Sequence, residues 1–136
     1  MIWIYTNIEP LPVEERQTDG MAQKIVNYII QPLGESDPSG YRYRYKFVTM
    51  EPGIWHFGAI VSALIRAEYP ADKMEAIQNN WMADPTNDNA VEEMLEMQNW
   101  RASAKFIARE AIRYVARING ETPPPLPKDH EINGWS

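Results

Sequence analysis

The feature that most constrains the fold is an uninterrupted segment from Asn89 to Asn119, which contains neither proline nor glycine and stops at Gly120. Asn89 stands three residues before Glu92, a spacing that predicts a capping box at a helix start, and glycine is a frequent helix stop. A helix of roughly 30 residues would be about 45 Å long. That length exceeds what a compact domain of this size needs.

Two shorter helices are predicted before it. Apolar residues recur at helical spacing from Phe57 to Ile65, and Tyr69-Pro70 ends that pattern because proline disfavours helical geometry in the preceding residue. A second pattern runs from Ala71 to Met82 and breaks at Asp84-Pro85. We expect the three helices to share one cluster of core residues, namely Phe57, Ile60, Val61, Leu64, Ile77, Trp81, Leu95 and Phe106.

The N-terminal part predicts strands. Residues 2 to 6 are bulky and β-prone, so they indicate a short strand or an apolar arm, whereas the polar residues 13 to 20 indicate a connector. Residues 24 to 33 and 41 to 50 are expected to pair as a β-hairpin across the turn-rich segment 34 to 40. Residues 24 to 33 also fit a helical stripe, and a strand is favoured because the second arm needs a partner.

The second arm alternates strictly between aromatic and cationic residues. In a strand, such alternation places the two kinds of side chain on opposite faces. We expect the aromatic residues Tyr41, Tyr43, Tyr45 and Phe47 to face the helices. The cationic face, toward solvent or a partner, would carry Arg42, Arg44 and Lys46.

These patterns predict an α+β fold: an N-terminal β-hairpin or small antiparallel sheet followed by three helices, the last of them long. One domain would cover residues 1–120, with the strands in 1–52 and the helices in 53–120. Residues 121–136 contain a polyproline run and are expected to form an extended tail.

Charge and composition restrict the possible partners. A net charge of -6 disfavours nucleic acid, since phosphate binding needs a concentrated cationic face. The apolar start lacks a basic leader and is interrupted within nine residues, so we expect no signal peptide, and no apolar run is long enough to span a membrane. A cytoplasmic or virion location is the expectation.

No catalytic, cofactor-binding or metal-binding signature stands out. The two histidines, His56 and His130, lie 74 positions apart, and the chain has no cysteine. Asp84, Thr86 and Asp88 resemble the start of a calcium loop, but Asn89 stands where that loop needs glycine and Leu95 where it needs glutamate. We therefore expect a protein that is not an enzyme and that uses no cofactor.

The apolar residues of the long helix fall on two nearly opposite sides. Either the helix kinks near Ser103, or its first half packs on the two preceding helices while its second half packs on something else. We assign the core to the side of Leu95 and Phe106. The apolar residues on the other side are then expected to form an exposed surface for a protein partner or for self-association. Together with a tryptophan of the tail, the predicted partner-binding residues are Trp100, Ile107, Arg109, Ala111, Arg113, Tyr114, Arg117, Ile118 and Trp135.

The segment Ala59–Tyr69, then Met74–Ile77 and Met97–Arg101, resembles small proteins of bacterial phage and prophage tail modules. Those proteins often pair a β-hairpin with a "hydrophobic-x-x-Leu-Ile-Arg-x-x-Tyr" helix and a following helical pair. The resemblance covers about residues 40 to 110 and implies a virion or assembly role, with no functional residue to carry over. The alternative is a small-molecule or anion-binding module that uses the basic residues of the hairpin or of the last helix.

Overall fold

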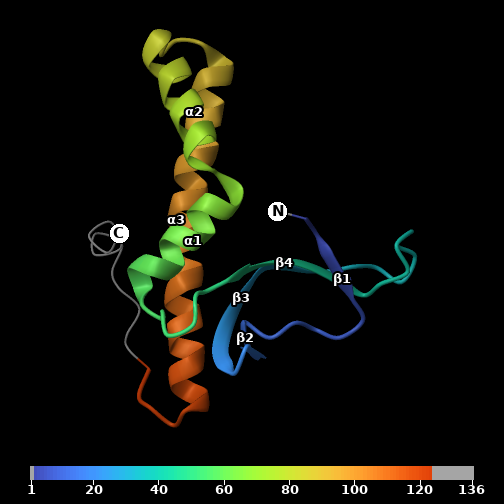
Figure 1. The fold of residues 1–136 in the computed structure, drawn as a ribbon. Coiled ribbons are helices and arrows are strands. Elements are labelled where there is room, and N and C mark those ends of the chain that lie inside the picture. Colours follow the sequence, from blue (N-terminus) through green and yellow to red (C-terminus); the bar gives the residue numbers. More distant parts are fainter. Residues whose placement is uncertain (1, 124–136) are drawn as a thin grey trace.

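The computed structural model describes residues 2–123, and within them a four-stranded antiparallel sheet precedes three helices (Figure 1). The strands are β1 (Ile4–Thr6), β2 (Val13–Thr18), β3 (Met21–Pro32) and β4 (Tyr43–Thr49). The helices are α1 (Phe57–Glu68), α2 (Ala71–Ala83) and α3 (Asp88–Ile118). The predicted α+β fold is therefore confirmed, including the long last helix, whereas the predicted tail lies almost wholly outside the described residues.

The sheet has the strand order β1-β4-β3-β2, so the predicted hairpin of β3 and β4 forms its centre. Residues 2 to 6 do contribute a short strand, which pairs with β4 through Ile4 and Tyr45. The prediction that residues 13 to 20 are a connector is wrong, because β2 pairs along its whole length with β3. Five of its six residues are exposed, which explains why the sequence shows no buried alternation there.

The predicted orientation of β4 is also wrong. Val48 and Met50 lie in the hydrophobic core, so the alternating face that they share with Lys46 and Arg44 is the one that faces the helices. Tyr43, Tyr45 and Phe47 consequently lie on the opposite face and are half-buried. Two apolar core positions follow the aromatic residues, Val48 within β4 and Met50 directly after its end, and these positions set the orientation of the strand.

The helices begin and end close to the predicted residues. The α1 helix stops before Tyr69-Pro70, and α3 ends in a Schellman motif in which the Gly120 N–H donates to Arg117 O and the Glu121 N–H donates to Ala116 O. The predicted capping box at Asn89 is wrong, because the α3 N-cap is Asn87, whose side chain accepts a hydrogen bond from the Ala90 N–H at 3.1 Å.

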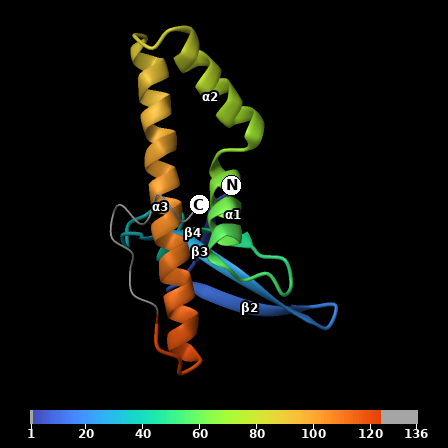
Figure 2. The ribbon, with the colours of Figure 1, turned by 90° about the vertical axis from the view of Figure 1, so that its left-hand side faces the viewer.

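The two halves of α3 have different neighbours. Figure 2 shows α3 as one continuous helix that meets α2 at its far end and approaches α1 and the sheet along its lower half. No kink interrupts it, so the first of the two predicted alternatives is wrong. The second is correct in giving the two halves different neighbours but wrong in placing α1 on the first half, because Phe57 of α1 lies beside Arg109 and α1 shares the core with Ala104 and Ala108. The core forms between the sheet, α1 and the C-terminal half of α3, to which α3 contributes Ala104, Ala108, Ala111 and Val115.

This arrangement corrects the predicted core. Ile60, Val61 and Leu64 are buried in it as expected, Phe57 packs against it, and Ile77 is buried outside this cluster. The remaining three predicted members, Trp81, Leu95 and Phe106, are exposed. Within residues 2–123, no helix combines the length and the apolar character that crossing a membrane requires.

Candidate interaction surface on the long helix

The inner side of α3 is built for close packing. Ala104, Ala108 and Ala111 recur at helical spacing and are almost completely buried, so their small side chains let the helix approach α1 and the sheet. Trp100 anchors the same side: its Nε1–H donates to the Leu64 carbonyl at 3.0 Å, and its ring lies 5.5 Å from that of Tyr28. This side of α3 therefore belongs to the protein's own core.

The opposite side of α3 carries exposed apolar residues. Leu95 is 57% exposed and Phe106 55% exposed, and a spacing of 11 residues places them on one side of the helix, about 16 Å apart. We name this side the outer stripe, and at 100° per residue its members share one flank. They are Asp88, Glu92, Leu95, Asn99, Ala102, Phe106, Glu110, Arg113 and Arg117. All of them are exposed except Glu110 and Arg113, which are half-buried.

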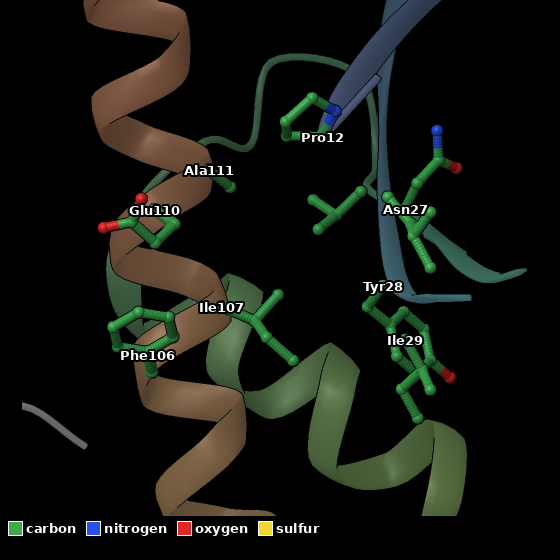
Figure 3. A pocket seen from close by; sticks show the side chains of 10 residues that line it. Pro12, Asn27, Tyr28, Ile29, Phe106, Ile107, Glu110 and Ala111 are labelled. Carbon is green, nitrogen blue, oxygen red and sulfur yellow. The ribbon is translucent and has the colours of Figure 1, made fainter. Parts of the chain in front are cut away.

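A hollow between α3 and β3 adjoins the outer stripe. It has a volume of about 190 Å³ and is lined mainly by apolar side chains of β3 and α3. Figure 3 shows Ile107 pointing across it toward Tyr28 and Ile29, and Phe106 also lines it from α3. Ile29 interrupts the β3–β4 pairing with a positive φ of 48°, a conformation that is rare for β-branched residues.

The structure separates the nine predicted partner-binding residues. Ala111 is buried, and Trp100, Ile107 and Tyr114 pack against the core, so the predicted exposed stripe is wrong for these residues. Arg109 is 4% exposed and its guanidinium lies 5.5 Å from the centre of the Phe57 ring. Arg113 is half-buried, Arg117 and Ile118 are exposed, and Trp135 lies outside the described residues.

Sequence reasoning placed Leu95 and Phe106 in the core and so missed them as surface residues. The signal that could have found them is the row of alanines on the other side of the helix. The small residues Ala104, Ala108 and Ala111 indicate the side of the helix on which the backbone approaches a neighbour closely. A single Leu or Phe does not indicate which side of the helix is buried.

Charge divides α3 and its surroundings into two zones. Residues 71–99, which form α2, its connection to α3 and the first part of α3, contain seven carboxylates and one cation, Lys73. Their net charge therefore equals that of the whole chain, -6. Residues 100–118 contain five cations and one carboxylate, Glu110. We call residues 71–99 the acidic arm and residues 100–118 the basic half of α3.

The cations of β4, proposed from sequence as an anion-binding alternative, are already engaged. Lys46 Nζ lies 2.6 Å from Glu68 Oε1 of α1, and Arg44 Nε donates to Gln31 Oε1 at 2.8 Å. Trp3 covers both cations, with its ring centre 4.1 Å from Arg44 Cζ and 4.8 Å from Lys46 Nζ. These contacts explain how the helix-facing side of β4 accommodates two cations.

Tyr28 belongs to the same network. Its hydroxyl donates to Glu68 Oε2 at 3.5 Å, and its side chain is almost completely buried. Burial, followed by the nearby Glu68 carboxylate, raises the pKa of Tyr28 well above the ordinary 10.0 because both disfavour the tyrosinate. In Arg109, burial and then the neighbouring Arg113 lower the pKa of the guanidinium. Both shifts follow from packing inside the protein.

In residues 2–123, no three side chains of the kinds that bind metal ions lie close enough together to hold one. Comparisons with protein-family models, with curated proteins and with solved structures find no match to this chain. Its functional interpretation accordingly rests on its own surface.

Proposed function

We propose that this protein is a non-enzymatic structural or assembly protein that acts through contacts with other protein chains, and that the outer stripe of α3 is its principal contact surface. The observation that carries the proposal is the exposure of Leu95 and Phe106 on a helix far longer than the core requires. Large apolar side chains on one flank, with charged residues at both ends, are typical of a protein interface.

The acidic arm supports the same proposal. It projects from the sheet (Figure 1), and its α2 helix exposes Trp81, at 41%, and Met82, at 71%. Tryptophan and methionine are enriched in interfaces, where large side chains provide most of the binding energy. A projecting arm with apolar residues near its tip offers a second contact to the same assembly.

The test is a pair of substitutions on the outer stripe, Leu95→Glu with Phe106→Glu. Because both side chains are exposed, the doubly substituted protein should fold as the parent does, with a melting temperature within a few degrees, and should lose association. Light scattering would measure the mass of the full chain alone and with co-expressed products of neighbouring genes. The control, Gln17→Glu with Ser36→Glu, adds the same charge at exposed sites of the N-terminal half.

An unchanged complex in the stripe variant would refute the outer stripe as the contact surface. A parent that stays monomeric and binds none of those gene products would refute the assembly role itself. Within this proposal, the resemblance of residues 40 to 110 to phage tail-module proteins suggests a tail or virion as the assembly. Immunodetection of the protein in purified particles would test that location, and its absence from them would count against it.

A further inference from the structure

The charged residues of α3 are divided by sign into two zones. Asp88, Glu92 and Glu96 follow one another at intervals of four residues, as do Arg109, Arg113 and Arg117. Like charges at this spacing are neighbours along a helix and repel each other. The helix dipole favours this polarity, but its effect is confined to the first and last turns. The acidic run reaches Glu96 and the basic run begins at Arg101, well beyond those turns.

From this polarity we infer that the partner of the outer stripe is a second copy of this chain, bound with its α3 antiparallel to the first. The inference rests on the proposed function. An antiparallel pair opposes the acidic arm of each copy to the basic half of the other, so opposite charges meet along both ends of the contact. A parallel pair would oppose like charges, which costs free energy.

The positions of the apolar residues fix the centre of this pairing. When the two helices cross between Asn99 and Ala102, Leu95 of each copy lies opposite Phe106 of the other. The same alignment brings Asp88 opposite Arg113 and places Arg117 beside Asp84, at the start of the arm. The contact is isologous, as a two-fold axis requires, and its apolar centre is flanked by complementary charges.

The part of this flank from Leu95 to Phe106 is exposed, whereas Arg113 beyond it is half-buried. Figure 2 shows α1 and α2 on the same side of α3, and the alanines that face the core lie on the side away from Leu95 and Phe106. Asn99 and Ala102 at the middle of the stripe, and Ser103 beside it, are exposed, and their short side chains would let two helices approach closely. A second hollow on the surface, lined by Ile29, Trp100, Ala102, Ser103, Phe106 and Ile107, provides room for a side chain of the second copy.

The decisive experiment uses two complementary charge variants of the full chain. The first, Asp88→Lys with Glu92→Lys, makes the acidic part of the stripe basic. The second, Arg113→Glu with Arg117→Glu, makes its basic part acidic. Each variant alone should associate at least about tenfold more weakly than the parent, which corresponds to about 1.4 kcal/mol. Mixed in equal amounts, they should form a heterodimer, because both pairs of facing zones are again opposite in charge. Sedimentation velocity measures all three samples. The charge-matched control is Glu9→Lys with Glu35→Lys, at exposed sites of the N-terminal half.

Orientation is tested by cross-linking, which is simple because the chain has no cysteine. Under mild oxidation, a mixture of Leu95→Cys and Phe106→Cys chains should give a disulfide-linked heterodimer, whereas each alone should give little linked dimer. Phe106→Cys mixed with Glu93→Cys, which lies on another side of α3, is the control. If the parent dimerises but the charge variants do not recover on mixing, or if Leu95→Cys links efficiently to itself, the antiparallel pairing is wrong. If the parent is monomeric yet binds another protein through Leu95 and Phe106, this inference fails while the proposed function stands.

Discussion

At the scale of single residues, the contacts between β4 and α1 show how polar groups are placed beside a core. Lys46 and Glu68 form an ion pair whose side chains are only 14% and 16% exposed. Because a charge left without its partner in such a place is costly, the pair depends on its close geometry and on the Tyr28 hydroxyl. The helix-facing side of β4 is therefore apolar at Val48 and Met50 and polar at Lys46.

Tyr28 makes this network sensitive to alkaline pH. Its pKa is raised in the folded protein, so its contribution to stability is complete below about pH 10 and is lost as the pH rises above that value. We predict that the free energy of unfolding of the parent falls above pH 10 by up to about 1.4 kcal/mol per pH unit more than that of Tyr28→Phe. Urea titrations at several alkaline pH values measure the difference.

The control for this prediction is Tyr41→Phe, which removes a hydroxyl at an exposed position and should keep the parent's pH dependence. Equal slopes for the parent and Tyr28→Phe would show that the Tyr28 hydroxyl ionises as readily in the folded protein as in the unfolded chain.

At the scale of elements, the sequence predicts the type and the order of the helices and strands well. It predicts poorly which face of each element is buried. The helices and the central hairpin follow from apolar periodicity, proline and glycine, which act locally. Which side of α3 is buried depends on how closely its alanines approach α1 and the sheet, and apolar spacing alone does not reveal that. The face of β4 was predicted wrongly for a related reason, since Val48 and Met50, outside the alternating aromatics, decide it. The β2 strand escaped detection because an exposed edge needs no apolar alternation.

The start of α3 offers a local test with a matched control. The Asn87 side chain accepts the Ala90 N–H, which would otherwise lack an intrahelical partner. We predict that Asn87→Ala lowers the free energy of unfolding by about 1 kcal/mol, whereas Asn89→Ala, two residues inside the helix, changes it by a few tenths at most. Chemical denaturation measures both. If Asn89→Ala lowered the free energy of unfolding more than Asn87→Ala does, the capping box predicted from sequence at Asn89 would be supported instead.

At the scale of the whole molecule, the structure divides into a packed body and a projecting arm. The body contains the core of the sheet, α1 and the second half of α3, whereas buried residues in the acidic arm are few: Ile77, Ala90 and Met97. The net charge of the arm, -6, also equals the net charge of the whole chain. Its own packing is thus thin, and a second copy whose basic half covered it would both neutralise its charge and shield its apolar residues.

This division predicts unequal stability along α3. Met97 is completely buried where the arm joins the body, so Met97→Ala should create a cavity that costs roughly 2 to 5 kcal/mol locally. Because the arm contributes little to the main core, the loss should appear as faster amide hydrogen exchange in residues 71–99, with the protection of β3 and β4 preserved. Leu64→Ala, in the centre of the main core, should instead speed exchange in the sheet and in α1 as well. Mass spectrometry measures amide hydrogen exchange in both variants. A uniform increase in the exchange rate throughout the chain of Met97→Ala would mean that the arm and the body unfold as one unit.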